Sequence, residues 1–596
     1  MTKYLTLLTI ILLHSCDMKK NEIVEPKAKK IDKILKMHDH ERNDEFYWLN
    51  ERDNPEVIDY LNAENTYRDS YMKEFKGLED EIFEEIKSRI KEDDSSVPYK
   101  DNGYYYYTRY EKGKQYPIYC RKKDNLKNQE EILIDANIMS EGHEYFRIGG
   151  IDISPDNKIM AYSVDTVSRR LYTIHFKNLE TGKENSHIIS NTSGGVSWAN
   201  DNKTVFYVKK DEQTLRSHKI YKHVLGTDSA DDELVFEEKD ETYSCYVYKS
   251  KSNKYLFIGS YQTLATEIRF LDANEPNGDW AIIQPRERGH EYSVSHYEDS
   301  FFIRTNWNAK NYKLMKTSVS SPVKENWEEL IAHRDDVFLS GIEIFKKFLV
   351  LQERKDGLIN MRVMNWSNNQ EHYISFNDPT YSVYPNVNLE FDTDLLRFSY
   401  SSLTTPNSVY DYNLVSKERK LLKQQEVLGG TFNSENYISE RLYATGRDGV
   451  TRIPISIVYK KGYNKDDSSP LLLYGYGSYG SNMNPYFSST RLSLLDRGFA
   501  FAIAHIRGGQ EMGRDWYESG KLLQKKNTFY DFIDCGKFLV DSGYTSPSHL
   551  YAQGGSAGGL LMGAIINMEP SLWNGVIAGV PFVDVINTMW DESIPL

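Results

Sequence analysis

The chain has 596 residues and a formal net charge of −14, with 44 tyrosines and only four cysteines. Its length predicts more than one core, because single domains usually span about 100–200 residues. The acidic balance argues against nucleic-acid binding, which needs a basic surplus to neutralise phosphates. Four cysteines are too few for a disulfide scaffold, and the tyrosine excess is typical of a β-rich protein.

The first residues have the pattern of an export signal. A basic start is followed by the apolar run Tyr4–Leu13, which is shorter than the roughly 20 residues of a membrane-spanning helix. Leu13-His14-Ser15-Cys16 resembles a bacterial lipoprotein box. We therefore expect residues 1–16 to be a signal peptide with Cys16 as its lipidated residue, and residues 17–30 to be a polar tether. The expected location is the cell envelope or periplasm, with the membrane reached only through the lipid; an unlipidated export signal, or a start codon assigned too early, is the alternative.

Residues 31–95 form the next predicted segment, which is helical. Val57, Ile58 and Leu61 recur at spacings of three and four, and a second apolar series runs over Leu78–Ile90 with Glu and Lys between its members. This spacing places the apolar side chains on one face of each helix.

The middle of the chain, residues 96–435, has a repeating β pattern. Short apolar strands recur every 45 to 55 residues, beginning at Tyr104, Ile159, Val205, Leu256, Phe301, Phe348 and Leu396. Each is followed by a turn-rich gap and a second strand. A period of about 40–50 residues with several strands per unit indicates a β-propeller, and seven units fit the count. An irregular pair of β-sandwiches is the alternative.

Residues 436–596 alternate strands with helices, which predicts a mostly parallel sheet. The expected strands and helices, in chain order, are Thr451–Lys460, Pro470–Tyr474, Phe499–His505, the helix Asn527–Ser542, Leu550–Gln553 and the helix Leu560–Met568. Between the last two lies Gly554-Gly555-Ser556-Ala557-Gly558. A G-x-S-x-G sequence between a strand and a helix is typical of the nucleophile elbow of α/β-hydrolases.

The elbow predicts a specific arrangement of its residues. Gly554 and Gly558 lack the Cβ atoms that would collide where neighbouring backbones come close. Ser556 Oγ would project above the sheet at a helix N-terminus, and the backbone N–H of Ala557 would point to a developing oxyanion.

These motifs resemble the prolyl oligopeptidase family. The resemblance is carried by Gly554–Gly559, Leu560–Gly563 and Val580–Asp584. It extends from about Lys29 to Leu596, and it is most similar to the oligopeptidase B branch. Further matches to that branch are Tyr47–Leu49, Ile153–Met160, Ser168–Arg170, Arg491–Gly498 and Asp591–Leu596.

The resemblance implies a seven-bladed propeller capping an α/β-hydrolase, with the N-terminal helical segment packed on the hydrolase. It implies a serine endopeptidase that acts on short peptides, because the propeller excludes folded proteins, and that cleaves after Arg or Lys. Ser556 matches the nucleophile, and Tyr476 matches the residue whose hydroxyl joins the Ala557 N–H in the oxyanion hole. Arg507–Glu511 matches a loop near the active site, which we interpret as structural. No phosphate loop, metal cluster or basic stripe is present, so we expect no cofactor and no metal.

Two members of the catalytic triad are not evident. In this fold the triad follows the order Ser, Asp, His, yet no histidine follows Ser556. His505 and His549 precede the nucleophile, and Asp584 and Asp591 come too early to orient a base. We therefore expect the triad Asp and His to lie beyond Leu596, and the chain as given to be C-terminally incomplete and inactive. An incomplete gene record, a frameshifted pseudogene and a functional truncated protein are the possible explanations.

Competing functions are a prolyl-specific oligopeptidase, an esterase on the same scaffold and a non-catalytic propeller that binds other proteins. The sequence after the elbow argues against the prolyl-specific enzyme, and the propeller repeats argue against the esterase. The elbow itself argues against a non-catalytic binding protein. Within Asn482–Tyr486, the resemblance implies aspartates that attract a second basic residue. Asn484 and Tyr486 are uncharged, which predicts a weaker preference for dibasic sites.

Overall fold

The structure is a computed structural model that describes residues 24–430 and 432–591. The predicted signal peptide, Cys16 and the first part of the tether lie outside these residues, as do the last five residues of the Asp591–Leu596 match. The chain forms two compact units, Met1–Ser88 and Arg89–Leu596. None of the helices in the described ranges combines the length and the apolar character that a membrane crossing requires.

The first unit contains the predicted helices, α1 (Pro55–Met72) and α2 (Lys76–Ser88). Helix α1 begins at a proline, and the side chain of Asn54 accepts a hydrogen bond from the backbone N–H of Glu56, which is a typical N-cap. A hairpin of β1 (Ile34–Met37) and β2 (His40–Asn43) precedes them and was not predicted. The predicted packing of this segment on the hydrolase stays a prediction.

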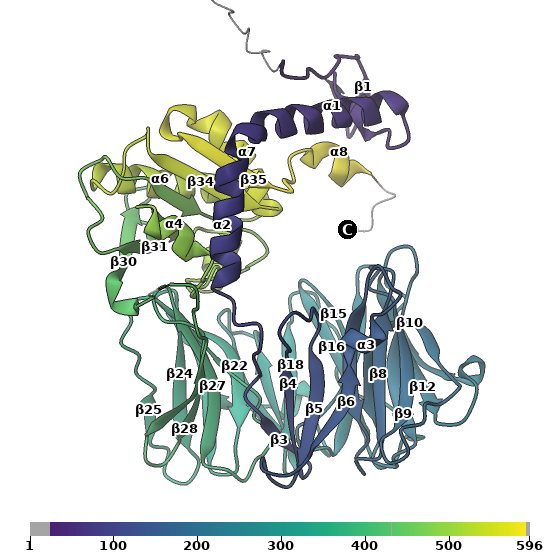
Figure 1. Cartoon of the computed structure of the whole chain (residues 1–596). Coiled ribbons are helices and arrows are strands. Elements are labelled where there is room, and N and C mark those ends of the chain that lie inside the picture. The colour runs from purple at the N-terminus through teal and green to yellow at the C-terminus, as the bar shows by residue number, and fades with distance from the viewer. Residues whose placement is uncertain (1–23, 431, 592–596) are drawn as a thin grey trace, which may run out of the picture. The chain divides into compact units, whose positions relative to one another are not determined.

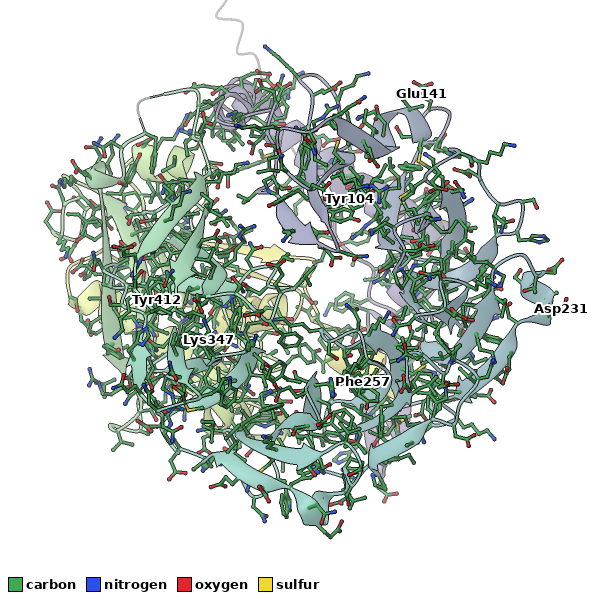
Figure 2. All side chains as sticks on the ribbon, turned by 90° about the horizontal axis from the view of Figure 1, so that it is seen from below. Tyr104, Glu141, Asp231, Phe257, Lys347 and Tyr412 are labelled. Carbon is green, nitrogen blue, oxygen red and sulfur yellow. The ribbon has the colours of Figure 1, made fainter. Side chains whose placement is uncertain are left out.

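The second unit begins with a β-propeller (Figures 1 and 2). Five of its sheets are antiparallel and four-stranded, with the strands in chain order. Their strands are β3 (Tyr99–Asp101), β4 (Tyr104–Arg109), β5 (Ile118–Lys123) and β6 (Glu130–Asp135); β14 (Ser244–Lys249), β15 (Tyr255–Gln262), β16 (Ala265–Asp272) and β17 (Ala281–Gln284); β18 (Tyr292–Tyr297), β19 (Ser300–Thr305), β20 (Lys313–Ser318) and β21 (Glu328–Ile331); β22 (Phe338–Ile344), β23 (Phe348–Lys355), β24 (Leu358–Asn365) and β25 (Glu371–Tyr373); β26 (Tyr381–Pro385), β27 (Leu395–Ser402), β28 (Ser408–Asn413) and β29 (Arg419–Gln424).

The other propeller strands form one seven-stranded sheet instead of two separate blades. They are β7 (Arg147–Ile153), β8 (Ile159–Asp165), β9 (Tyr172–Asn178), β10 (Ile189–Trp198), β11 (Thr204–Lys210), β12 (Ser217–Val224) and β13 (Glu233–Glu237). Strand β10 joins the two halves, because Ile189 pairs with β9 while Val196–Trp198 pair with β11. The prediction of seven separate blades was therefore wrong: the ring has five four-stranded blades and this fused sheet.

The strand starts themselves were predicted closely. Each of the seven predicted starts lies within one residue of an observed strand start, namely those of β4, β8, β11, β15, β19, β23 and β27. Several of these strands carry a continuous run of buried apolar residues, as in Leu256, Phe257 and Ile258, which are fully buried. Inner strands of several blades line a cavity of about 1070 Å³.

The hydrolase sheet has the order β30-β31-β33-β32-β34-β35. The pairings β30–β31 and β31–β33 are antiparallel, and the remaining pairings are parallel. This mostly parallel sheet agrees with the prediction. The strands are β30 (Tyr437–Thr445), β31 (Arg452–Lys460), β32 (Leu471–Tyr474), β33 (Ala500–Ala504), β34 (Leu550–Gly555) and β35 (Gly575–Gly579).

Helices cover this sheet and define its two faces (Figure 1). On one face Leu471 and Leu473 pack in a core with α6 (Lys526–Asp541) and α7 (Ala557–Met568). On the other face Leu472 packs with α4 (Arg491–Asp496). Two further helices are α5 (Arg514–Glu518) and α8 (Val585–Trp590). The alternation along β32 follows from the two-residue period of strand side chains.

Candidate active site

Ser556 lies at the turn between β34 and α7, as the sequence predicts. Its backbone has φ 57° and ψ −117°, a conformation that non-glycine residues adopt only when their surroundings enforce it. The Ser556 N–H donates to the carbonyl of Gly579 at 2.9 Å, and its carbonyl accepts from Phe582 N at 3.1 Å. These bonds hold the turn, and the serine itself is solvent-exposed.

The elbow glycines are required because backbones approach closely there. A Cβ at position 554 would lie 2.3 Å from the carbonyl oxygen of Gly558, and one at position 558 would lie 2.8 Å from that of Gly475. A Cβ at position 559 would have equally little space, since it would lie 2.4 Å from Pro581 Cα. Contacts under 3.0 Å between a Cβ and the backbone force a backbone shift. The structure thus gives the steric reason for the glycines that the motif predicts.

Tyr476 lies in the segment that follows β32 and packs against the elbow, since a Cβ at position 558 would lie 3.3 Å from its ring atom Cδ2. Burial raises the pKa of Tyr476, and a hydrogen bond with Ser556 works against this rise. Ala557 is the first residue of α7 and is buried. The first N–H groups of a helix have no acceptor within the helix and are available to an anion. The predicted oxyanion donors are therefore brought to one place.

Lys525 supports the Tyr476 segment and was not identified from the sequence. Its Nζ donates to the carbonyl of Gly477 at 2.5 Å and to Ser478 Oγ at 2.7 Å. Burial lowers the pKa of Lys525 to about 8. Lys525 lies 48 positions from Gly477 and 47 positions from Ser478 in the sequence. No local sequence pattern therefore indicates these two hydrogen bonds.

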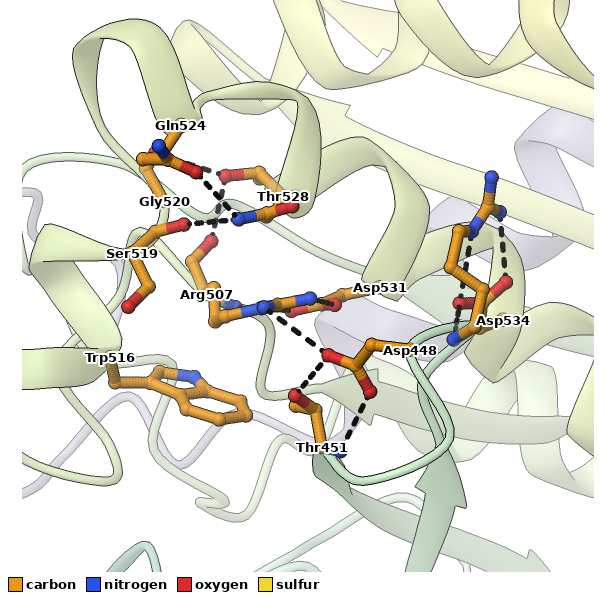
Figure 3. Close-up of polar contacts among 12 residues, drawn as sticks. Asp448, Thr451, Arg507, Trp516, Ser519, Gly520, Gln524, Thr528, Asp531 and Asp534 are labelled. Carbon is orange, nitrogen blue, oxygen red and sulfur yellow. Dashed lines mark hydrogen bonds and ion pairs between the residues drawn. The ribbon is translucent and has the colours of Figure 1, made fainter.

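The loop after β33 is held by the ion pair of Arg507 with Asp531 (Figure 3). Arg507 Nε donates to Asp531 Oδ2 at 2.8 Å and Nη2 donates to Oδ1 at 2.5 Å; the Asp531 side chain is fully buried. Hydrogen bonding to Asp531 raises the pKa of Arg507. Thr528 Oγ1 donates to the Arg507 carbonyl at 2.8 Å. These contacts support the structural role expected for Arg507–Glu511.

His505 and His549, the two histidines of the hydrolase domain, are not positioned to serve Ser556. His549 precedes β34 and contacts Ser546 Oγ at 2.9 Å, whereas Ser556 follows the other end of that strand. Six strand residues at about 3.3 Å each separate them by about 20 Å. His505 is 1% exposed and bonds Ser456 Oγ through Nε2 at 2.8 Å. Asp584 precedes α8 and accepts from Asn587 Nδ2 at 3.0 Å.

His505 is expected to make folding stability depend on pH. Burial lowers its pKa to about 4, against about 6.5 in an unfolded chain. Between these values the unfolded chain binds a proton that the native state does not, so the free energy of unfolding falls as pH falls. From pH 7 to pH 5, His505 should contribute a loss of about 2 kcal/mol.

Urea unfolding of the wild type and His505→Gln at pH 7, 6 and 5 measures this contribution. The variant should lose less stability than the wild type over this range, since glutamine can keep the bond to Ser456 and does not titrate. Equal losses in the two proteins would contradict the assignment.

A cavity of about 390 Å³ lies on the sheet face opposite α7. Its lining includes Tyr474, Asn484, Tyr486, Arg491 and Gln553. Burial lowers the pKa of Arg491 to about 10.

Within the described residues, no group of three or more His, Cys, Asp or Glu side chains is placed to hold a metal ion.

Comparison with known proteins identifies the family. The family profile "Prolyl oligopeptidase, N-terminal beta-propeller domain" matches residues 26–425, and "Prolyl oligopeptidase family" matches residues 485–596. Dipeptidyl aminopeptidase BI of Pseudoxanthomonas mexicana is 43% identical over 96% of this chain and 81% of that protein. Protease 2 of Moraxella lacunata is 37% identical over 96% of this chain and 83% of that protein.

A solved structure agrees with these matches. The structure of oligopeptidase B from Leishmania major aligns with a TM-score of 0.88 at 37% identity, covering 96% of this chain and 84% of that chain. Sequence and structure point to the same group of enzymes. The chain belongs to the prolyl oligopeptidase family of serine peptidases.

Proposed function

We propose that this protein is an oligopeptidase that cleaves short peptides after Arg or Lys through an acyl-enzyme on Ser556. The observation that carries the proposal is the convergence of the Ser556 hydroxyl, the Tyr476 hydroxyl and the N-terminus of α7 at one turn. Attack by Ser556 Oγ on a peptide carbonyl would create an oxyanion, which Tyr476 and the Ala557 N–H would stabilise. One such donor typically contributes on the order of 10²–10³ in turnover.

The preference for Arg or Lys is what the resemblance to the oligopeptidase B branch implies, and the similarity to a solved oligopeptidase B supports that resemblance. A second basic residue in the substrate, next to the Arg or Lys, should add little to this preference. Asn484 Oδ1 accepts from Arg354 Nη2 at 2.8 Å, and its amide also contacts the Tyr384 hydroxyl. Asn484 is therefore engaged by a propeller cation, whose charge would repel another positive side chain.

The polypeptide of residues 1–596 should not complete this reaction by itself. No histidine follows Ser556 in it, and His505 and His549 are held elsewhere. Without a base, a serine hydroxyl is a weak nucleophile. We expect no Ser556-dependent hydrolysis of arginyl amides by this polypeptide.

An active-site titrant tests the proposal without requiring turnover. The polypeptide is incubated with 4-nitrophenyl 4-guanidinobenzoate, with and without imidazole as an added base, and the acylated residue is located by mass spectrometry. We expect imidazole-dependent acylation of Ser556, its loss in Ser556→Ala, and a rate on the order of 10²-fold lower in Tyr476→Phe. Neutral 4-nitrophenyl acetate serves as the specificity control.

Acylation that persists in Ser556→Ala, or that occurs on other residues, would refute the assignment of Ser556 as the nucleophile. Equal reaction with the cationic and the neutral ester would refute the preference for Arg or Lys. Rapid hydrolysis of an arginyl amide by the unaided polypeptide, abolished in Ser556→Ala, would refute its inactivity.

Removal of dipeptides from free amino-termini is a second candidate function. It is favoured by the 43% identical relative named dipeptidyl aminopeptidase BI. Alanyl-arginyl esters with a free or an acetylated amino group distinguish the candidates under the same titration. Preferential reaction of the free amine favours the dipeptidyl activity, and indifference to acetylation favours the endopeptidase.

The location proposed for the protein is the cell envelope, with Cys16 as a lipid anchor. The support is the apolar run Tyr4–Leu13 and the following Leu13-His14-Ser15-Cys16.

A further inference from the structure

Lys525 carries a positive charge at a place where electrostatics disfavours it. It immediately precedes α6, and the N-terminus of a helix is the positive end of its dipole. Its side chain is partly buried, and among the described residues no carboxylate forms an ion pair with it. The same desolvation lowers its pKa to about 8. A charged residue that costs folding stability in this way is expected at a functional site.

The two groups that Lys525 bonds both belong to the turn that follows β32. Its Nζ donates to the carbonyl of Gly477 at 2.5 Å and to Ser478 Oγ at 2.7 Å. Hydrogen bonds from a charged donor are roughly twice as strong as those between neutral groups. Two of the three N–H groups of the ammonium are therefore committed to neighbouring residues of this turn.

The backbone of this turn needs support from outside. Tyr479 has a φ of 59°, a left-handed conformation that costs free energy for a residue with a Cβ. Backbone hydrogen bonds tie the two ends of the turn, from Gly475 N–H to the carbonyl of Gln553 at 3.1 Å and from Gly480 N–H to that of Gly508 at 2.9 Å. The ammonium group holds the stretch between these ends.

Tyr476 lies in the held stretch and packs on the elbow. A Cβ at position 558 would lie 3.3 Å from Tyr476 Cδ2 and 3.4 Å from Tyr476 Cα, so both the ring and the backbone adjoin the start of α7. Gly477 follows directly, and its carbonyl oxygen would lie only 2.1 Å from a Cβ at position 508. Because the two residues share a peptide bond, a movement of Gly477 also moves Tyr476.

We infer that Lys525 is a positioning residue for the oxyanion hole, and that its ammonium group fixes the Gly477 peptide so that Tyr476 stays against the elbow. The inference rests on the proposed role of Tyr476 as an oxyanion donor. Without the ammonium group, the Gly477 carbonyl loses its shortest hydrogen bond. The peptide can then rotate, because glycine has no Cβ to restrict it, and the Tyr476 hydroxyl leaves the position from which it reaches an oxyanion.

Lys526 provides a matched control, because it is the next residue and carries the same charge. It is the first residue of α6, and its side chain is exposed. Within the described part of the chain, the hydrogen bonds from a lysine to the turn come from Lys525. Lys526→Met therefore removes one positive charge from the same helix terminus and leaves those hydrogen bonds in place.

A double-mutant cycle on the full chain tests whether Lys525 acts through Tyr476. The rate of Ser556 acylation by 4-nitrophenyl 4-guanidinobenzoate with imidazole is measured for the wild type, Lys525→Met, Tyr476→Phe, the double variant and Lys526→Met. We expect Lys525→Met to lower this rate about tenfold, because a displaced donor loses much of its effect. In the presence of Tyr476→Phe, the same substitution should change the rate by less than about twofold, since the hydroxyl that it positions is gone. Lys526→Met should leave the rate unchanged.

A second readout follows the turn without any reaction. The full chain carries 3-fluorotyrosine at position 476, and its ¹⁹F spectrum is recorded at about pH 6.5, where the Lys525 ammonium is protonated. Amide exchange is followed at Gly480 and Ser481, whose N–H groups are bonded to the carbonyls of Gly508 and Ser478. Lys525→Met should shift the resonance and speed this exchange at least about tenfold, whereas Lys526→Met should do neither.

The inference is overturned if Lys525→Met leaves the acylation rate or the ¹⁹F resonance unchanged, if it slows acylation equally with and without Tyr476→Phe, or if Lys526→Met reproduces its effects. Should Lys525→Met not fold, Lys525→Gln, which is neutral and one atom shorter, must meet the same criteria. Failure of the proposed function is distinguishable: Ser556 acylation would then be insensitive to Tyr476→Phe, while Lys525→Met would still shift the resonance and speed the exchange.

Discussion

Replacing Gly554 by alanine is expected to destabilise the hydrolase domain by about 3 kcal/mol and to abolish acylation of Ser556 by the titrant. The added Cβ would lie 2.3 Å from the carbonyl oxygen of Gly558 and 2.8 Å from its carbonyl carbon. Both atoms belong to the first turn of α7, so relief of the clash must move the helix away from β34. Because Ser556 connects these two elements, its strained conformation cannot survive that movement.

The adjacent glycine is the matched control. A Cβ at position 555 would meet only the carbonyl oxygen of Gly579, at an ordinary 3.5 Å. Gly555→Ala should therefore change the free energy of unfolding by less than about 1 kcal/mol and keep the reaction of Ser556. Urea unfolding and titrant labelling of both variants measure the difference. Equal tolerance of alanine at the two positions would contradict the close approach at Gly554.

Replacing Asp531 by asparagine is expected to cost about 3 kcal/mol of folding stability. The change leaves the mostly buried Arg507 with only the longer ion pair to Asp448, at 3.8 Å, to compensate its charge. The Asp531 side chain is fully buried, and that of Arg507 is 13% exposed. Asp531 also accepts from the backbone N–H of Arg507 at 3.0 Å, so the start of the loop that carries Glu511 loses a backbone contact as well.

A second Arg–Asp ion pair, whose aspartate lies on the same helix α6, isolates the effect of burial (Figure 3). Arg447 Nη2 donates to Asp534 Oδ1 at 2.8 Å, and Asp534 lies one helical turn from Asp531. The Arg447 side chain is 43% exposed and that of Asp534 is 10% exposed. Solvent screens this pair, so Asp534→Asn should cost about 1 kcal/mol or less. Unfolding measurements on both variants test the comparison, and a loss in Asp534→Asn as large as that in Asp531→Asn would show that burial is not the cause.

Features that depend on nearby residues were predictable from the sequence. The turn at Ser556 follows from five consecutive residues, since the glycines around the serine are the only residues without a Cβ. The seven strand starts of the propeller follow from short apolar or aromatic runs, several of which are buried on both faces of the blade, as in Phe348–Leu351 of β23. Local sequence sufficed because a strand or a turn is selected by its own side chains.

Features that depend on partners far apart in the chain were not predictable. The sequence predicted two separate blades where the structure has one seven-stranded sheet. Strand β10 is long enough for one end to pair with β9 and the other end with β11, and this joins the two blades. The support of the Tyr476 segment needs Lys525, which lies 48 positions from Gly477 in the sequence.

The sequence alone thus determined the order of the elements, the elbow and the family of this protein. The tertiary structure decided which charged side chains share a buried site and which segments they hold. The physical reason is that a buried charge is tolerated only where a compensating group reaches it. Folding of the whole chain brings the compensating group to the charge, so no local sequence pattern indicates a pair such as Arg507 and Asp531.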